Sequence, residues 1–437
     1  MTDSPTTPKA PRAAKAAATA ASPASPPAIE SSEARGGSKR ALSVGVVASL
    51  AVGAVIGGVT GAGVTLWATS QNQPEQVATA GQATTISVND PNNATQITAA
   101  AAKASPSVVT ISVSSNTAGG TGSGVVLTTD GYILTNTHVV TLDGAAADAT
   151  VSVQTSDGRL LDATIVGTDP IADLAVIKVD GVDLVPAVFA DSSKLNVGDT
   201  TIVIGAPLGM TGSVSNGIIS ALNRSISVAS AALPAPTDSA PSTPGENPFD
   251  FWNFDIPGQA APNAGSSATI SLAVIQSDAA INPGNSGGAM VNSDGEVIGI
   301  SVAIASAGSG SGQSGSIGIG FAIPSNFAQR IANELIETGS ATHGLLGASV
   351  VDVAEDDTQK DATMVGASIV KLSAGGAAEV AGLRVGDIIT AFEGLPITGK
   401  TDLTAQVRAL AGGAPATVDF LRSGKLSQVA VTLDSLK

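Results

Sequence analysis

The sequence predicts a mostly β fold, and three observations support this prediction. Residues 108–113 are rich in β-branched side chains and alternate in polarity, which is typical of a strand. An Asp-Gly pair, the signal of a tight hairpin, separates strand-like runs at Asp130-Gly131, Asp157-Gly158 and Asp294-Gly295. Few helical patterns intervene, so antiparallel hairpins in a barrel or a sandwich are favoured over a doubly wound sheet.

The composition limits the classes of function. A chain of 437 residues is long enough for two or three domains. Its 20 basic and 36 acidic residues give a net charge of -16, which argues against a nucleic-acid-binding protein. The chain has no cysteine and only two histidines, His138 and His343. We therefore expect no disulfide, no cysteine nucleophile, no metal site and no cofactor.

The N-terminal part predicts a membrane anchor. Residues 1–40 are rich in Ala, Pro, Ser and Thr and predict a disordered tail. Residues 41–67 carry no charge, and a helix of this length would measure ~40 Å, enough to span a ~30 Å hydrocarbon core. A cleaved signal peptide is the alternative, but its apolar core is usually only ~7–15 residues long. Residues 68–95 are polar and predict a linker.

The charges beside this anchor predict its orientation. Three basic residues, Arg35, Lys39 and Arg40, precede the apolar segment, and the next basic residue is Lys103. The positive-inside rule then places the N-terminus in the cytoplasm and the rest of the chain outside.

The remainder predicts two folded domains, 96–324 and 344–437, joined by a helix and linker at 325–343. Within this connection Phe327, Ile331 and Leu335 are spaced by four, and the helix is expected to end at Gly339. Residues 225–268 form a Pro/Ser/Ala-rich insertion in the first domain and are predicted to be flexible.

Ser286 is the candidate nucleophile. It stands in the run Ile-Asn-Pro-Gly-Asn-Ser-Gly-Gly at 281–288, where glycines permit φ > 0 and can aim backbone N–H groups at an oxyanion. Glycine-flanked serines also arise by chance in a chain with 50 glycines, as at 310–312. The run alone leaves both interpretations open.

A nucleophilic serine needs a base and an acid that orients the base. His138 follows the strand after Asp130-Gly131, whereas His343 lies in the connection, where little would hold a base; His138 is therefore the candidate. A purely structural histidine is the alternative. Asp173 opens a strand-like run and is the candidate acid, with Asp169 and Asp180 as competitors.

These residues and their motifs resemble the HtrA/Deg family of trypsin-like serine proteases. The order is His138 in Thr-Asn-Thr-His-Val-Val, Asp173 in Asp-Leu-Ala-Val-Ile, and Ser286 in Gly-Asn-Ser-Gly-Gly. Further matching segments are 195–199, 204–209, 276–288 and 318–324. The resemblance covers about residues 96–324 and implies two packed six-stranded β-barrels with a triad in the cleft between them.

The resemblance also implies a role for each site residue. His138 would be the general base, Asp173 would hold its tautomer, and Ser286 would attack the peptide carbonyl. The N–H groups of Gly284 and Ser286 would form the oxyanion hole. The floor of the substrate pocket would be Ala280, six residues before the nucleophile, and an uncharged floor favours aliphatic side chains.

A different hydrolase class can be tested on the same residues. Gly284-x-Ser286-x-Gly288 also fits the nucleophile elbow of α/β-hydrolases, which requires the order Ser, acid, His and a helix after the serine. Only His343 follows Ser286, and the next residues predict a hairpin. The sequence therefore argues against this class.

The C-terminal domain resembles a PDZ domain of the type that follows HtrA protease domains. The resemblance rests on Gly-Leu-Leu-Gly at 344–347 and on residues 381–389. A loop of this kind can hold a peptide carboxylate, while an exposed strand edge pairs with the peptide. The residues predicted to bind the peptide are Leu345, Leu346, Gly347, Leu403 and Val407. The alternative is that they are ordinary core positions.

Two departures from the family pattern are the short segment between Val113 and Gly124, where some members have a long loop, and His343. His343 stands where relatives often carry a basic residue, and it would make peptide binding pH-dependent unless it is a solvated linker residue. The resemblance implies that the 225–268 insertion lies at the position of a regulatory loop, and its aromatic cluster is expected to dock on the protease or PDZ domain and tune activity, a simple tether being the alternative. Its aromatic cluster is Phe249, Phe251, Trp252 and Phe254.

The sequence thus predicts a membrane-anchored, extracytoplasmic serine endopeptidase of bacteria that degrades misfolded or signalling proteins. Expected partners are unfolded or membrane-associated proteins, C-terminal peptides on the PDZ domain, and the membrane through a single helix. The family implies a homotrimer. The alternative function is a PDZ-bearing chaperone or adaptor with weak or incidental proteolysis.

Overall fold

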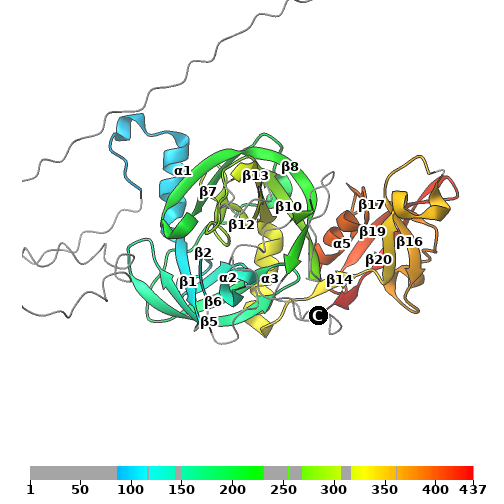
Figure 1. The fold of residues 1–437 in the computed structure, drawn as a ribbon, viewed down its shortest axis with the longest axis horizontal. Coiled ribbons are helices and arrows are strands. Elements are labelled where there is room, and N and C mark those ends of the chain that lie inside the picture. Colours follow the sequence, from blue (N-terminus) through cyan, green and yellow to red (C-terminus); the bar gives the residue numbers. More distant parts are fainter. Residues whose placement is uncertain are drawn as a thin grey trace, which may run out of the picture. The chain divides into compact units, whose positions relative to one another are not determined.

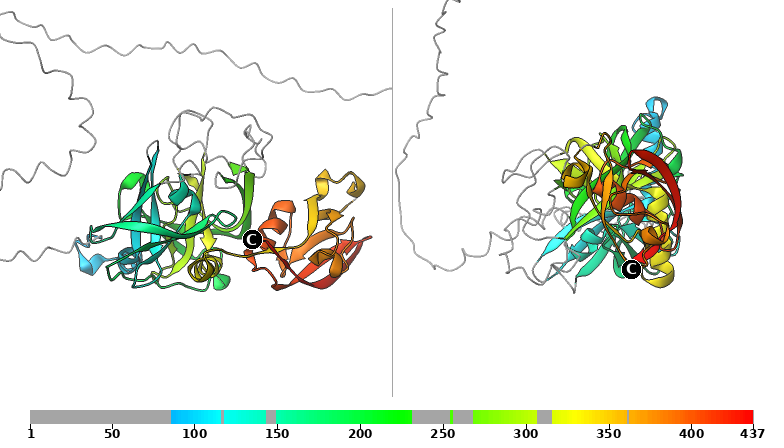
Figure 2. Two further views of the ribbon diagram at one scale, coloured as in Figure 1. Left: turned by 90° about the horizontal axis from the view of Figure 1, so that it is seen from below. Right: turned by 90° about the vertical axis from the view of Figure 1, so that its right-hand side faces the viewer.

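The computed structural model describes residues 86–115, 118–142, 149–230, 254–255, 268–306, 316–360 and 362–436. The ribbon shows two β-barrels followed along the chain by a smaller β-rich domain (Figures 1 and 2). The predicted tail at 1–40 and the predicted membrane span at 41–67 lie outside the described residues. None of the helices in the described ranges is long and apolar enough to cross a membrane.

The first barrel is a closed six-stranded sheet with the order β1-β2-β3-β6-β5-β4. Asp130-Gly131 lies in the turn between β2 and β3, and Asp157-Gly158 lies between β4 and β5, so both predicted hairpins are confirmed. The strands are β1 (Val108–Ser114), β2 (Gly119–Val126), β3 (Tyr132–Thr135), β4 (Thr150–Gln154), β5 (Leu160–Asp169) and β6 (Leu174–Val179). Inward side chains such as Ile111, Ile133 and Ile177 are fully buried, as alternation along a strand predicts.

The second barrel has the order β10-β13-β12-β11-β7-β8 and closes through the pairing of β10 with β8. Its strands are β7 (Thr200–Gly205), β8 (Ser213–Ser230), β10 (Ala268–Ser277), β11 (Ala289–Val291), β12 (Val297–Ser306) and β13 (Ser316–Pro324). Asp294-Gly295 joins β11 to β12, which confirms the third predicted hairpin. The expectation of two six-stranded barrels therefore holds.

The predicted insertion is shorter than expected. Residues 225–230 continue β8 and pair with 268–273 of β10, and Ile226 is buried in the barrel core. Inside the insertion, the two-residue strand β9 (Phe254–Asp255) pairs with Val228 and Ser227 of β8. The rest of the insertion, with Phe249, Phe251 and Trp252, lies outside the described residues.

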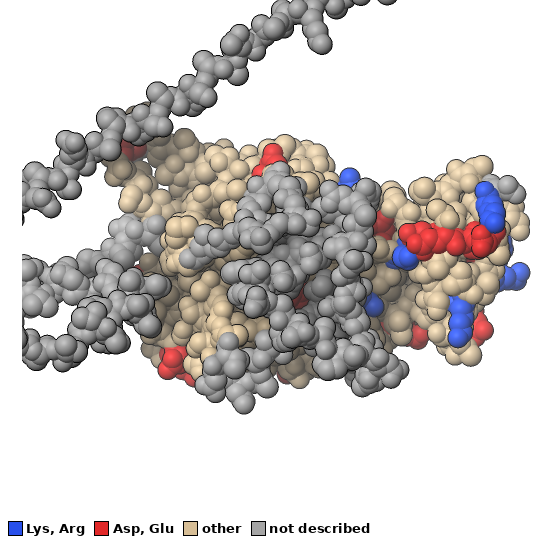
Figure 3. Space-filling model, viewed as in Figure 1, with Lys and Arg blue, Asp and Glu red and all other residues tan. Residues whose placement is uncertain are grey.

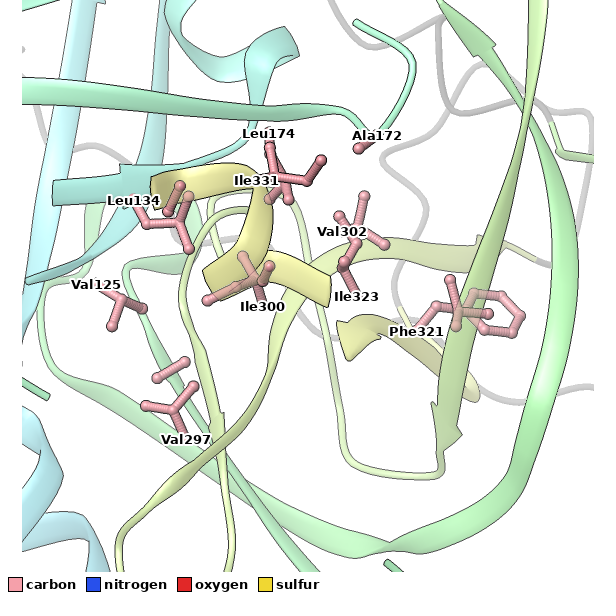
Figure 4. Close-up of a cluster of buried hydrophobic side chains, with 14 of the residues drawn as sticks. Val125, Leu134, Ala172, Leu174, Val297, Ile300, Val302, Phe321, Ile323 and Ile331 are labelled. Carbon is pink, nitrogen blue, oxygen red and sulfur yellow. The ribbon is translucent and has the colours of Figure 1, made fainter. Parts of the chain in front are cut away.

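Helix α3 (Ser325–Thr338) confirms the predicted connecting helix and packs against both barrels. It ends where Gly339 adopts φ 75°, the left-handed conformation that commonly terminates helices. Ile331 belongs to a buried cluster that includes Leu134 and Leu174 of the first barrel and Ile300 of the second (Figure 4). Each such buried side chain contributes about 1.5–3 kcal/mol, so α3 stabilises the arrangement of the barrels.

Two short helices of the protease domain were not predicted. In α1 (Gln96–Ala104), the Thr95 hydroxyl caps the first turn, and Ala100, Ala101 and Ala104 are buried against the same core cluster. Helix α2 (Thr137–Thr141) follows β3 directly. The 3₁₀ turns are η1 (Pro91–Asn93), η2 (Ser105–Ser107), η3 (Ser192–Lys194), η4 (Pro207–Gly209), η5 (Val353–Glu355) and η6 (Asp357–Gln359).

The C-terminal domain has its own core and a sheet of order β15-β16-β17-β19-β20. Its elements are β14 (His343–Leu345), β15 (Ala348–Asp352), β16 (Ala367–Leu372), α4 (Ala377–Val380), β17 (Ile388–Phe392), β18 (Leu395–Pro396), α5 (Lys400–Ala409), β19 (Pro415–Arg422), β20 (Lys425–Thr432) and β21 (Asp434–Leu436). On the face drawn in Figure 3, charged side chains are sparse over the uncovered barrel surface and denser over this domain. His343 pairs with β21, so it belongs to this domain and not to a linker.

Candidate active site

His138 lies on α2, and the residues before it fasten this helix to the turn between β5 and β6. The Asn136 side chain donates to the Asp173 carbonyl at 2.8 Å, and the Thr137 hydroxyl donates to the Leu174 carbonyl at 2.6 Å. Asn136 and Thr137 are fully buried, so their polar groups need these partners. The segment that carries His138 is therefore held rigidly beside Asp173.

The Asp173 side chain holds His138 by two contacts. Its Oδ1 accepts the backbone N–H of His138 at 3.0 Å, and its Oδ2 lies 2.7 Å from the ring Nδ1. Because an ionised carboxylate only accepts, Nδ1 carries the proton and Nε2 is left as the basic nitrogen of a neutral ring. Asp173 itself adopts φ 52°, an uncommon conformation for a residue other than glycine, and is nearly buried.

The structure separates Asp173 from its two competitors. Asp180 is exposed and pairs with Lys178 at 3.3 Å. Asp169 is buried, but its Oδ2 contacts Nε2 of His343 at 2.9 Å. Of the three aspartates, Asp173 is the one whose side chain contacts His138.

Ser286 lies between β10 and β11 in a loop that packs against the His138 segment. Its carbonyl accepts the N–H of Ser123 at 2.8 Å. Gly287 adopts φ 80°, and a Cβ there would lie 2.2 Å from the Ser123 carbonyl oxygen and 2.3 Å from Oγ1 of Thr135. Only glycine permits this approach. The sequence-predicted segments of His138, Asp173 and Ser286 are thus brought together.

The serine loop contains two backbone donors, the N–H groups of Gly284 and Ser286. Gly284 adopts φ 98°, and its carbonyl accepts the Ser123 hydroxyl at 2.8 Å. Within the described part of the chain, the N–H groups of Gly284 and Ser286 donate to no protein acceptor. Such a pair of free donors can stabilise a developing oxyanion.

Ser123 was not singled out from the sequence, yet it joins the two halves of the site. Its hydroxyl accepts the Ala206 N–H at 2.9 Å while donating to the Gly284 carbonyl, and its own carbonyl accepts the Thr135 hydroxyl at 2.7 Å. The available signal was that Ser123 stands between two glycines, Gly122 and Gly124.

Ala280 is exposed in the same loop, and its carbonyl accepts the Ser215 hydroxyl of β8 at 2.6 Å. The nearest carboxylate in sequence is Asp278, whose Oδ1 accepts the Ile218 N–H at 2.7 Å. Asp278 is therefore engaged with the backbone of β8.

The residues predicted to bind a peptide occupy two different environments. Leu345 is 40% exposed, and Gly347 adopts φ 72° in the loop between β14 and β15. The carbonyls of Leu346 and Gly347 accept N–H groups within the domain, both at 2.8 Å. Leu403 and Val407 of α5 belong to the hydrophobic core and are almost fully buried.

No three His, Asp or Glu side chains in the described ranges converge as metal ligands would. The arrangement that remains is a histidine oriented by a carboxylate, beside a glycine-rich serine loop with free backbone donors. Such a site is equipped for acyl transfer through a serine nucleophile.

Each of the two folded domains matches the model of a known protein family. The family model of the trypsin-like peptidase domain matches residues 122–300, and that of the PDZ domain matches residues 344–433. The first match contains His138, Asp173 and Ser286.

Two proteins with similar sequences are named as serine proteases, which is consistent with the family matches. Serine protease PepD of Mycobacterium tuberculosis is 38% identical over 341 residues, which cover 76% of this chain and 65% of the relative. The periplasmic serine endoprotease DegP of Escherichia coli is 38% identical over 317 residues, covering 72% of this chain and 56% of the relative. This chain therefore spans less than two thirds of the length of either relative.

A solved structure extends the similarity over both domains. The HtrA-type protease AlgW with a bound tripeptide is 30% identical to this chain, with a TM-score of 0.54. The match covers 78% of this chain and 97% of that structure's chain.

Proposed function

Because the chain belongs to the HtrA/Deg family of trypsin-like serine proteases with a C-terminal PDZ domain, we propose that it is an extracytoplasmic serine endopeptidase. The observation that carries this proposal is the contact of the Asp173 carboxylate with Nδ1 of His138, beside the Ser286 loop. This contact orients the ring and sets the tautomer that a general base requires.

The proposed reaction begins with attack of Ser286 Oγ on a peptide carbonyl. Nε2 of His138 takes the hydroxyl proton, and Asp173 stabilises the imidazolium that forms. The N–H groups of Gly284 and Ser286 stabilise the oxyanion, which is the effect that usually contributes most to acyl transfer. His138 then protonates the leaving amine, and water releases the acyl group by the same steps in reverse.

The substrates proposed are misfolded or signalling proteins outside the cytoplasm. Periplasmic relatives support this location. The uncharged segment at 41–67 supports a membrane anchor with a cytoplasmic N-terminus. The PDZ match supports regulation by peptides that bind near residues 344–347. Assembly as a homotrimer is proposed from the family alone.

Degradation of casein by the purified protein tests the enzymatic proposal. The wild type is expected to degrade unfolded casein, and Ser286→Ala is expected to abolish degradation because the nucleophile is lost. Ser293→Ala, in the turn between β11 and β12, is the matched control and should retain the wild-type rate. Equal degradation by wild type and Ser286→Ala, or none by the wild type, would favour a chaperone or adaptor.

Cell fractionation tests the anchor. The full chain should sediment with membranes and resist extraction by high salt, whereas deletion of 41–67 should release it. A wild-type protein found in the soluble fraction would contradict the anchor without affecting the enzymatic proposal.

A further inference from the structure

His343, the second histidine of the chain, is buried between the two folded parts, and its sequence interpretation as a solvated linker residue is wrong. Its side chain is only 1% exposed. Its ring Nδ1 lies 2.8 Å from the carbonyl oxygen of Arg408, at the end of α5. Its ring Nε2 lies 2.9 Å from Oδ2 of Asp169, at the end of β5. Both ring nitrogens therefore face oxygen atoms.

These two contacts determine the number of protons. A carbonyl oxygen and a carboxylate oxygen are both acceptors, so each contact needs an N–H on the ring. Neutral imidazole has one N–H, whereas the imidazolium ion has two. With Asp169 ionised, both hydrogen bonds form only when His343 is charged.

Asp169 connects this histidine to the turn that carries Asp173. Its Oδ1 accepts the N–H of Ile171 at 3.0 Å and the N–H of Ala172 at 3.3 Å. Asp173 is the next residue and adopts the uncommon φ of 52°. The carboxylate of Asp169 therefore holds the turn on one oxygen and His343 on the other.

On α3, Arg330 and Glu334 have other partners, and α5 carries the half-buried Arg408. On α3, Arg330 contacts Glu334 at 2.6 Å and donates to the Thr342 carbonyl at 2.9 Å. Glu334 also accepts the N–H of Thr342 at 2.6 Å. On α5, burial lowers the pKa of the Arg408 guanidinium.

Asp169 provides the negative charge that faces His343, because the remaining neighbours are aromatic or have other partners. From α3, the ring of Phe327 lies edge-on to His343 with its centroid 6.4 Å away. From β21, which pairs with β14, Oδ2 of Asp434 accepts the N–H of Ala377 at 2.8 Å. Among the described ion pairs, Asp169 is the carboxylate that contacts the His343 ring.

We propose that Asp169 and charged His343 are positioning residues for the serine protease reaction. Charged His343 anchors Asp169, which fixes the turn that presents Asp173 to His138. Because His343 begins β14, which leads directly into the loop of Leu346 and Gly347, the same contact links the PDZ domain to the triad acid. Loss of the His343 proton removes one of the two hydrogen bonds and loosens the turn. The inference rests on the proposed triad.

Two substitutions at Asp169 distinguish the effect of the second proton on His343 from the effect of the hydrogen bonds that shape the turn. In Asp169→Asn, Oδ1 can still accept both N–H groups, and Nδ2 can donate to Nε2 of a neutral His343, so no extra proton is needed. Asp169→Ala removes all of these bonds. The matched control is Asp191→Asn, because Asp191 also joins two segments, accepting from Ser193 and Asn326, but lies at η3 away from His343.

Steady-state kinetics with an unfolded substrate provide the first test. We expect the wild-type kcat to fall on the alkaline side as His343 loses its proton. Asp169→Ala and His343→Leu should lower kcat by roughly ten- to hundredfold with little change in KM, because the turn is misplaced. Asp169→Asn should recover most of the loss caused by Asp169→Ala and should lack the alkaline fall. Asp191→Asn should follow the wild type.

Several results would overturn the inference while leaving the enzymatic proposal intact. They are an unchanged kcat in His343→Leu, no recovery by Asp169→Asn, or the same alkaline fall in Asp169→Asn as in the wild type. In each case Ser286→Ala would still be inactive. If the wild type itself were inactive, the proposed function would fail first.

Nitrogen-15 NMR of the imidazole rings provides the second test and does not depend on activity. The chain has two histidines, so the spectrum of Ser286→Ala contains two rings, and His343→Leu in that background assigns them. We expect His343 to carry both protons at neutral pH and to become a neutral Nδ1–H ring after Asp169→Asn. A neutral His343 ring at neutral pH in both proteins would overturn the inference.

Discussion

The Asp173 carboxylate contacts both the backbone and the ring of His138. Its Oδ1 lies 3.0 Å from the backbone nitrogen, and its Oδ2 lies 2.7 Å from the ring Nδ1. A carboxylate that contacts only the ring would orient the ring alone, whereas this double contact also adds to the hydrogen bonds of Asn136 and Thr137 that hold α2. The unusual φ of 52° at Asp173 is maintained by the bonds around the β5–β6 turn. The geometry of the proposed base therefore depends on the Asp173 side chain as well as on the hydrogen bonds of Asn136 and Thr137.

Substitution of Asp173 by Asn should lower kcat by about 10⁴-fold without unfolding the protein. The Asn amide can donate to Nδ1, which favours the tautomer in which Nε2 carries the proton and cannot act as a base. Casein hydrolysis and a thermal melt measure both effects. Asp180→Asn is the control, because Asp180 is exposed beside Lys178. A loss of less than tenfold would argue against Asp173 as the orienting acid.

The protein should cleave after small or medium aliphatic residues such as Val, Ala or Leu. Ala280 provides no charge at the proposed pocket floor, and Asp278 is bound to β8. Discrimination of about 1–3 kcal/mol per methylene group is expected. Sequencing of the cleavage sites in a digested denatured protein measures this preference, and Ala280→Asp should shift it toward Lys and Arg. Cleavage mainly after basic residues by the wild type would contradict the assignment.

Activity should rise with pH through roughly pH 6–7, because a general base must be neutral and histidine titrates in this range. A chelator should leave the rate unchanged, and a serine-directed phosphonate should abolish it. Rates measured across pH with each reagent test this prediction. Inactivation by the chelator would reveal a metal requirement that the described residues do not suggest.

Substitution of Glu334 by Gln should destabilise the protein at neutral pH but not in acid. Burial raises the pKa of the Glu334 carboxyl, but hydrogen bonds from Thr342 and Arg330 outweigh it, and the net pKa is lowered. A lowered pKa contributes stability above the unfolded value of about 4.3 and loses it as the pH falls through the folded value. The expected loss at pH 7 is roughly 1–3 kcal/mol.

Denaturant unfolding at pH 7 and below pH 4 measures this difference. Glu337→Gln, an exposed position on the same helix, is the control and should match the wild type at both values. A loss for Glu334→Gln that persists in acid would show that the carboxylate charge is not its cause.

Deletion of residues 247–256 should change the basal rate or its response to PDZ peptides. The deletion removes β9, whose backbone pairs with Val228 and Ser227 of β8, while β7 and β10 still flank β8 and should preserve the fold. An equal deletion of 234–243 is the control. If the 247–256 deletion alters neither quantity, the insertion is only a tether.

Much of the fold could be predicted from local sequence. The three Asp-Gly turns, the first strand and α3 with its terminal Gly339 were all found, because turn and cap residues favour particular φ and ψ angles within a few positions. Helix α1 was missed, since its alanines form a helix through burial against the barrel core and lack a strong periodic pattern.

The residues of the candidate site were also predictable in part from local sequence. Sequence alone singled out Ser286 in its glycine-rich loop and His138 after its strand as candidates, because the required backbone freedom and side-chain type are local properties. It named Asp173 as the candidate acid but left Asp169 and Asp180 as competitors, and it did not detect the link through Ser123.

Only the tertiary structure decided which partner each histidine has. His138 contacts an aspartate 35 positions away, and His343 contacts one 174 positions away. Local patterns carry no information on such separations, because contacts of this kind form only when barrels, α3 and the C-terminal domain pack together. Packing buries His343, which was expected to be solvated, beside Asp169, where an unpaired polar group would be costly.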